Sequence, residues 1–205
     1  MDKDQALVRR YEASAPPPQT LADIQGVYEA SFPPEERTPF AQIPAEIRAG
    51  RRSLWVTEPF RGFALTTDLM APEGDVLLDY VAVAAAHRNR GVGPLLLRAL
   101  LADVAAPILL EIEDPDTSSD PFAARRLDFY RRQGAAPLAH SHGYAMPNLV
   151  TGELLPMNLW ELAPDRRTAP PSLPDAQRLV TLIWVNGYRL PPTDERLRVV
   201  LDSMS

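Results

Sequence analysis

The fold is decided by one stretch near the middle of the chain, residues 76–104, which reads VLLDYVAVAAAHRNRGVGPLLLRALLADV. Its apolar start, from Val76 to Ala84, is typical of a buried strand. The residues from His87 to Gly93 are basic and contain two glycines, and leucines then repeat at helical spacing from Pro94 to Val104. A further apolar run, Pro107 to Ile112, predicts a second strand. This order of strand, loop, helix and strand predicts a right-handed crossover between parallel strands.

The basic loop has the parts of an anion-binding site. Its glycines let the backbone turn N–H groups toward a ligand, the helix start carries partial positive charge, and Arg88 and Arg90 add full charges. Proline at position 94 suits the first position of a helix, where a missing N–H costs nothing. A P-loop is excluded because no lysine follows Lys3, and a dinucleotide loop is disfavoured because position 96 is leucine instead of glycine. A solvated surface loop is the alternative for both arginines.

The remaining elements are predicted from periodicity and from helix or turn signals. Strands are expected over residues 7–11, 53–57, 62–66, 138–144 and 157–162, the second and third as a hairpin joined through Pro59. Helices are expected after an N-cap at Thr20, over residues 40–49, from Asp120-Pro121 to Gly134, and around Leu179 and Leu197. The pattern predicts an α/β (α+β) fold.

Length and proline content bound the domain organisation. A chain of 205 residues, 45% of them hydrophobic, builds one well-buried core and a small appendage. Six of the 22 prolines fall between residues 164 and 192, where the composition shifts toward short apolar helices. We therefore predict one domain over residues 1–162 and a proline-rich helical extension over residues 163–205.

Composition also excludes several functions. Without cysteine the chain forms no disulfide, thiolate metal site or cysteine nucleophile. His140 and His142 would share one strand face, but no third ligand is in view, so we expect no metal. The formal charge of -6 argues against nucleic-acid binding. Because no apolar run is long enough for a signal peptide or a membrane span, we expect a cytoplasmic protein without membrane contact.

Several stretches, taken in order, resemble the GCN5-related N-acetyltransferase (GNAT) family. Arg88-x-x-Gly91-x-Gly93 matches the family signature R/Q-x-x-G-x-G/A. Residues 78–97 are similar to the family's fourth strand and third helix, and residues 107–111 to its fifth strand. Residues 124–134 are similar to its A-x-R-x-x-x-F-Y-x-R-x-G helix. The resemblance covers residues 7–162 and is most specific over residues 76–136. It implies the GNAT fold, a central mixed twisted sheet of about six to seven strands flanked by helices, with the helical extension added at its C-terminal end.

The resemblance implies that acetyl-CoA is the co-substrate and that no metal takes part. Residues expected to bind it lie in the phosphate loop and in the main chain of the preceding strand: Val81, Ala82, Val83, Arg88, Asn89, Arg90, Gly91, Val92 and Gly93. Two positions depart from the family pattern. Ala123 stands where relatives often use an asparagine to hold the pantetheine arm, and Pro94 removes one amide from the cradle.

The resemblance also implies direct attack of an acceptor amine on the thioester, with no acyl-enzyme. Tyr130 is expected to protonate the departing thiolate, although a tyrosine on an apolar helical stripe is also an ordinary core residue. Asp79 is expected to act as the base, with four competitors: Glu35, Glu36, Glu111 and Glu113. The stretch from Phe32 to Arg37 resembles a segment that borders the acceptor site in some members, and a polar turn is its alternative.

Acidic residues indicate the class of acceptor. Five of them and no basic residue lie between Glu111 and Asp120, and Glu35 and Glu36 form a second group. We therefore expect an N-acetyltransferase that acts on a cationic amine of a small molecule or peptide, with Glu35, Glu36 and Glu111 as acceptor-binding residues. The alternative is a non-catalytic acyl-CoA-binding regulatory module. Residues 163–205 are expected either to cover the acceptor cleft or to form a homodimer contact.

Overall fold

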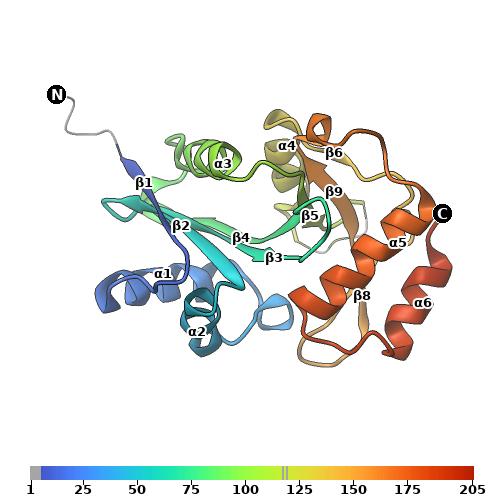
Figure 1. Cartoon of the computed structure of the whole chain (residues 1–205). Coiled ribbons are helices and arrows are strands. Elements are labelled where there is room, and N and C mark those ends of the chain that lie inside the picture. The colour runs from blue at the N-terminus through green and yellow to red at the C-terminus, as the bar shows by residue number, and fades with distance from the viewer. Residues whose placement is uncertain (1–5, 117, 119) are drawn as a thin grey trace. The chain divides into compact units, whose positions relative to one another are not determined.

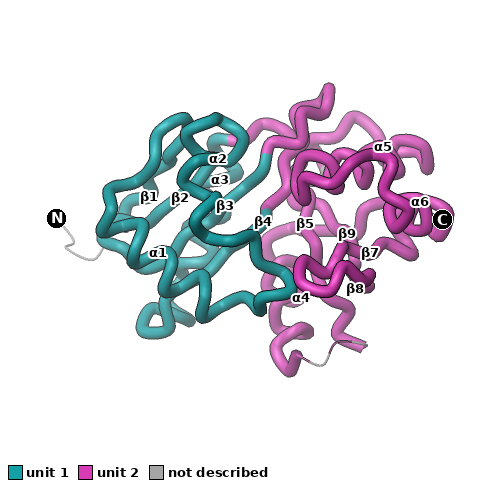
Figure 2. The backbone as a smooth tube through the Cα atoms, turned by 90° about the horizontal axis from the view of Figure 1, so that it is seen from below, with its two compact units in different colours: residues 1–67, 79–103 teal, residues 68–78, 104–205 magenta. Residues whose placement is uncertain are grey.

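The computed structural model describes residues 6–116, 118 and 120–205. Part of the predicted domain, residues 1–5, and Thr117 and Ser119 of the acidic stretch lie outside the described residues. The chain divides into two compact units, coloured separately in Figure 2: residues 1–67 with 79–103 form unit 1, and residues 68–78 with 104–205 form unit 2. Strand β4 (Val76–Val83) begins in unit 2 and ends in unit 1.

The strands of unit 1 are antiparallel neighbours. They are β1 (Leu7–Tyr11), β2 (Arg52–Glu58) and β3 (Gly62–Asp68), with Arg9 opposite Val56 and Trp55 opposite Ala64. The turn between β2 and β3 is fixed by the Thr57 hydroxyl, which accepts hydrogen bonds from the backbone N–H groups of Arg61 at 2.7 Å and Gly62 at 3.2 Å. The predicted hairpin is confirmed.

Helices cover both faces of this part of the sheet. In Figure 1, α1 (Pro18–Ser31) and α2 (Ile43–Arg48) lie on one face of β1–β3, and α3 (Val92–Asp103) lies on the other. Leu54 and Val56 of β2 share a buried cluster with residues of α1 and α2. Trp55 points to the opposite face, where its indole N–H donates to Oδ2 of Asp103 at 2.7 Å. The alternation along β2 therefore fixes which helix covers each face.

Unit 2 is built around β5 (Ile108–Ile112) and β9 (Asn158–Leu162), which are antiparallel. The start of β4 pairs with β5 in parallel, so the predicted parallel strands are confirmed. Three further strands complete the unit: β6 (Ala136–Pro137) pairs with β9, while β7 (Ala145–Pro147) and β8 (Leu154–Pro156) pair with each other. The hydrogen-bonded order is β1-β2-β3-β4-β5-β9-β6, a mixed sheet of seven strands.

The C-terminal helices share a core with β5 and β9. These helices are α5 (Leu173–Leu182), a π-helical turn (Ile183–Gly187) and α6 (Glu195–Ser203), and their apolar side chains surround Leu109, Leu159 and Trp184. The other face of β9 meets α4 (Ala123–Arg132), where the Arg131 guanidinium lies 5.3 Å from the centre of the Trp160 ring. Residues after 163 are thus part of the same core as the sheet, and the boundary at residue 162 stays a prediction.

Short 3-10 helices form at Pro34–Glu36, Phe40–Gln42, Ala85–His87 and Pro164–Arg166. Among the described residues, no helix combines the length and the apolar character needed to cross a bilayer.

Three predicted helix starts were wrong by two or three residues. Helix α1 begins at Pro18 instead of after Thr20, because proline is already suited to a first turn. Pro94 is the third residue of α3, a position whose N–H would also lack an intrahelical partner. Helix α4 begins at Ala123, since the carboxylate of Asp120 accepts from the Phe122 N–H at 2.9 Å and holds a turn before the helix.

The predicted strand over residues 138–144 was wrong. Ala136 and Pro137 pair with β9, and the Leu138 N–H donates to the Leu159 carbonyl at 3.0 Å. The chain then turns through His140, with φ 58°, and Gly143, with φ 88°. His140 and His142 therefore do not alternate along a strand face. Strands β7 and β8 were missed because three-residue strands that each end in proline are too short to show a two-residue period.

Candidate active site

The predicted phosphate loop lies in unit 1, between β4 and α3. The chain leaves β4 at Val83, and the Ala84 N–H donates to the Arg61 carbonyl at 2.8 Å. The Arg88 side chain folds back, and its Nε donates to the Val83 carbonyl at 3.2 Å. Arg88 is thereby anchored across the end of the strand, while Arg88 and Arg90 both remain exposed.

The loop backbone turns through the left-handed region twice before the helix begins. Asn89 has φ 60° and Gly91 has φ 78°. The space around the Gly91 Cα is open, so the backbone conformation, not packing, requires glycine there. Beyond the turn, the N–H groups of Val92 and Gly93 lie in the first turn of α3, where no intrahelical acceptor exists. This arrangement can bind an anion.

The strand that precedes the loop is closely packed on its neighbour. Ala82 is buried, whereas Val81 and Val83 are partly exposed. A Cβ placed on Gly62 of β3 would lie 2.6 Å from the Ala82 carbonyl oxygen, so only glycine fits at that position. The main chain predicted to face the pantetheine arm is therefore held by close backbone contact with β3.

Asp79 lies in a charged cluster of unit 1. Its Oδ2 accepts from the Thr67 hydroxyl at 2.8 Å. Arg52 is 3% exposed, and its Nε lies 2.9 Å from Oε2 of Glu46. Burial lowers the pKa of Arg52, but the carboxylates of Asp79 and Glu46 outweigh it and raise that pKa above its usual value. Asp79 thus stabilises a buried guanidinium, a role that the sequence did not predict.

The segment with Glu35 and Glu36 is tied to β4 by Tyr80. The Tyr80 hydroxyl donates to the Glu36 carbonyl at 2.9 Å and accepts from the Thr38 N–H at 3.0 Å. Both glutamates are partly buried. Burial raises the pKa of Tyr80, and Asp79 adds to the shift. Sequence analysis missed Tyr80, although a tyrosine beside an acidic residue in a buried strand is a usable signal.

Tyr130 belongs to unit 2, on α4. Its side chain is partly buried, and its ring centre lies 5.1 Å from that of Phe129. Burial raises the pKa of Tyr130 to about 12, although Arg126 opposes the shift. The phenol therefore keeps its proton at neutral pH. Ala123, one turn before Leu127, is 1% exposed and packed, so its methyl group supplies no polar contact.

Glu111 on β5 is held by two tyrosines. The Tyr144 hydroxyl donates to its Oε1, and the Tyr188 hydroxyl donates to its Oε2 at 2.5 Å. Tyr144 is 2% exposed, and burial together with the Glu111 carboxylate raises its pKa well above the usual value. Neither tyrosine was predicted, because Tyr144 stood in an expected strand and Tyr188 in a segment with no expected chemistry.

The acidic stretch after β5 is divided by its contacts. Both Glu113 and Asp120 pair with the Arg126 guanidinium of α4. Oδ1 of Asp114 accepts from the Asp116 backbone N–H at 2.9 Å. Arg126 therefore offsets part of the negative charge, and Glu113 is already engaged in an ion pair.

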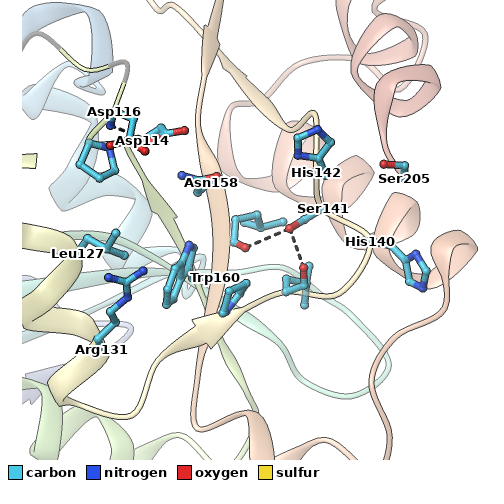
Figure 3. A pocket seen from close by; sticks show the side chains of 14 residues that line it. Asp114, Asp116, Leu127, Arg131, His140, Ser141, His142, Asn158, Trp160 and Ser205 are labelled. Atoms are coloured by element: carbon cyan, nitrogen blue, oxygen red, sulfur yellow. Dashed lines mark hydrogen bonds between the residues drawn. The ribbon is translucent and has the colours of Figure 1, made fainter. Parts of the chain in front are cut away.

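Unit 2 also contains a cavity of about 390 Å³ beside β9. Figure 3 shows its walls, with Asp114 and Asp116 on one side and His140 and His142 on the other. Its floor includes Ser141, whose hydroxyl donates to the Leu138 and Leu159 carbonyls at 2.7 and 3.2 Å. Among the described residues, no group of three acidic or histidine side chains is arranged to hold a metal ion.

A family model described as the acetyltransferase (GNAT) family matches residues 19–129, more than half of the chain. The chain belongs to the GNAT family. The GNAT match includes the phosphate loop and β5, and it ends one residue before Tyr130. Tyr144 and Tyr188 lie outside it.

Solved GNAT structures share this fold. A putative acetyltransferase of the family from Bacteroides thetaiotaomicron is 24% identical, with a TM-score of 0.70 over 84% of this chain and 94% of that one. An aminoglycoside 6'-N-acetyltransferase complexed with coenzyme A is 16% identical, with a TM-score of 0.56 over 76% and 95% of the two chains. NAA60 from Arabidopsis thaliana, in complex with acetyl-CoA, is 14% identical, with a TM-score of 0.54 over 77% and 97%. No curated protein matches the sequence.

Proposed function

We propose that the protein transfers the acetyl group of acetyl-CoA to the amine nitrogen of a small molecule or peptide. The observation that carries this proposal is the loop from Arg88 to Gly93, which places two arginines and the first N–H groups of a long helix directly after β4 in a GNAT chain. These groups would bind the pyrophosphate of the coenzyme. The main chain of Val81–Val83 would pair with the pantetheine arm.

The transfer proceeds by direct attack within a ternary complex. The amine nitrogen forms a bond to the thioester carbon, the carbon–sulfur bond breaks, and coenzyme A leaves as a thiolate. Tyr130 would donate its proton to that thiolate, a role supported by a phenol pKa raised to about 12. Two carboxylates are candidates for accepting the amine proton, Asp79 on β4 and Glu111 on β5.

We infer a cationic acceptor from the acidic groups that each unit carries. Glu35 and Glu36 lie in a segment fixed to β4, and Glu111 lies in unit 2 with both oxygens positioned. Carboxylates favour an ammonium group over a neutral one because opposite charges attract more strongly where water is partly excluded. The acceptor class is therefore an amine that is protonated at neutral pH.

The proposal is tested by measuring transfer from acetyl-CoA to a panel of alkylamines, diamines, aminoglycosides and peptides with a free α-amino group. We expect Tyr130→Phe to lower kcat by about 10²-fold or more, the size of a lost general acid. Coenzyme A affinity, measured by calorimetry, stays the same. Because the pKa of Tyr130 is raised to about 12, this phenol stays protonated between pH 8 and 10. Deprotonation of Tyr130 should therefore not lower kcat of the wild type in that range.

A non-catalytic acyl-CoA-binding module is the second candidate, favoured by Ala123 in place of the family asparagine. Coenzyme A binding without turnover on any amine would support the module and contradict the transferase. A chain that binds neither coenzyme A nor acetyl-CoA would contradict both functions.

A further inference from the structure

Glu111 occupies a distinct place on β5. The parallel pairing of β5 with β4 joins Ile108 to Val76 and Leu109 to Leu77, and Glu111 lies two residues further along. Because side chains alternate along a strand, Glu111 shares its face with Leu109, the face covered by the C-terminal helices. A partly buried carboxylate therefore stands just beyond the last paired residues of the two strands.

The two phenols fix this carboxylate from separate parts of unit 2. Tyr144 precedes β7 and is almost fully buried, whereas Tyr188 follows the π-helical turn and is partly buried. Each donates to a different oxygen of Glu111, so both carboxylate oxygens are held by a hydroxyl donor. Hydrogen bonds from two hydroxyls favour the ionised carboxylate and hold it in one orientation.

We propose that Glu111 is the base of the transfer and that Tyr144 and Tyr188 are its positioning residues. This inference rests on the proposed function. Residues 163–205, which carry Tyr188, would then belong to the catalytic machinery through that one hydroxyl.

The proton and electron balance is complete. The ammonium group of the acceptor first gives one proton to a Glu111 oxygen, and the lone pair this frees on the nitrogen forms the bond to the thioester carbon. The carbon–sulfur bond breaks, and the thiolate takes a proton from Tyr130. The nitrogen loses its second proton to solvent as the amide forms, the Tyr130 phenolate takes up a proton from solvent, and Glu111 releases its proton to solvent.

Asp79 is less suited to this step. Its charge is used to stabilise Arg52, a guanidinium that is nearly inaccessible to water. Protonating Asp79 would remove a counter-charge from that guanidinium, which is costly inside a protein. The tyrosine hydroxyls around Glu111 are neutral, so its protonation leaves no buried cation uncompensated among these three side chains.

Titratable groups around Glu111 come from several elements. Tyr144 and Tyr188 contact it directly, and burial and the carboxylate raise the pKa of Tyr144 well above its usual value. On β9, the residue opposite Glu111 is Leu159, and the next titratable side chain on that strand, Glu161, is paired with Arg167 at 2.9 Å. The pH dependence of the Glu111→Gln variant is therefore compared with the protonation of the amine.

Glu111→Gln is the main test, with the best amine of the panel as probe. At pH 7 we expect kcat/KM for the amine to fall by about 10²- to 10³-fold, the usual loss of a general base. The difference in kcat/KM between the wild type and this variant should shrink about tenfold for each unit by which the pH rises toward the pKa of the amine, near 10.4 for a lysine-like group. The reason is that the variant reacts only with amine that is already deprotonated. A merely structural loss would be the same at every pH. Asp79→Asn should show no such narrowing.

Tyr188→Phe tests the positioning role. We expect kcat to fall about tenfold, with KM for the amine and coenzyme A affinity within twofold of the wild type. Tyr11→Phe is the matched control, because Tyr11 also donates to a glutamate, Oε1 of Glu58 at 3.4 Å, in unit 1. The control should leave kcat and its pH dependence unchanged.

Several results would overturn the inference. A Glu111→Gln variant with raised KM and unchanged kcat would show that Glu111 only binds the amine. If the difference in kcat/KM shrinks with rising pH in Asp79→Asn instead, Asp79 is the base. In both cases the wild type still transfers acetyl groups, so the proposed function stands. A wild type that transfers to no amine overturns both.

Discussion

The phosphate loop depends on the absence of a side chain at Gly91. Its left-handed φ of 78° turns the chain into α3, and nothing lies near its Cα that a methyl group would strike. Any residue with a Cβ would pay for that conformation with about 1 kcal/mol of strain or would move the amides of the loop.

We predict that Gly91→Ala weakens coenzyme A binding about tenfold while lowering the free energy of unfolding by about 1 kcal/mol. Calorimetric titration and urea unfolding measure the two effects. Gly26→Ala is the matched control, because Gly26 lies exposed in the middle of α1 with equally open surroundings and no positive φ. It should raise stability by about 0.5–1 kcal/mol and leave coenzyme A binding alone. Unchanged affinity in Gly91→Ala would contradict the proposed role of the loop.

Local sequence motifs identify only some of the residues of the candidate site. Arg88, Gly91 and Tyr130 could be predicted because each belongs to a local motif. Tyr144 and Tyr188 could not, because they meet Glu111 across 33 and 77 positions of sequence and no periodicity encodes such contacts. The same holds for Arg52, whose partners come from α2 and β4.

At the scale of elements, Arg167 joins three segments of unit 2. Its side chain is 6% exposed and contacts Glu73 at 3.0 Å, Asp75 at 2.5 Å and Glu161 at 2.9 Å. It thereby ties the chain after β9 to the turn that leads into β4. Burial raises the pKa of Glu161 above its usual value even though Arg167 opposes the shift.

We predict that Arg167→Met lowers the free energy of unfolding by about 3–5 kcal/mol at pH 7, because Asp75 and Glu161 lose their buried counter-charge. A carboxyl group with a raised pKa in the folded state stabilises the fold when protonated, and this contribution is lost as the pH rises through that pKa. The loss of unfolding free energy in the variant, relative to the wild type, should therefore become smaller as the pH is lowered from 7 to 5. Urea unfolding at the two pH values measures it.

Arg178→Met provides the comparison, since Arg178 is exposed and lies 3.9 Å from Asp175. It should cost less than about 0.5 kcal/mol at either pH. An equal loss in both variants would mean that the buried contacts of Arg167 contribute little.

Elements with a clear periodicity of apolar residues could be predicted from the sequence, whereas very short strands could not. The strand–loop–helix–strand unit from β4 to β5 was confirmed because long apolar runs and a helical stripe define it. The two-residue β6 and three-residue β7 and β8 depend on pairing partners, which no local pattern reveals.

For the molecule as a whole, the C-terminal segment is part of the core of unit 2. Leu179, Trp184 and Val200 are buried against Leu109 and Leu159. A chain cut after residue 162 would expose the apolar face of β5 and β9 that these helices cover.

We predict that residues 1–162 alone are insoluble or bind coenzyme A at least tenfold more weakly than the full chain, since the cut removes Leu179, Trp184 and Val200 from the core of unit 2. Solubility after expression, circular dichroism and calorimetric titration would show this. A cut after Met204 is the control, because it removes only Ser205, which is exposed. A shortened chain that stays folded and binds as well as the full chain would support an independent domain ending at residue 162.

The distribution of tryptophans gives the molecule built-in optical reporters. Trp55 lies in unit 1 with its indole N–H on Asp103, whereas Trp160 and Trp184 lie in unit 2, one beneath Arg131 and one in the helical core. Replacing Trp55 with Phe leaves emission from unit 2 alone, and replacing the other two leaves emission from unit 1 alone. Fluorescence can therefore follow the thermal unfolding of each unit separately. If coenzyme A binds through the loop of unit 1, it should raise the midpoint temperature of the change in Trp55 emission.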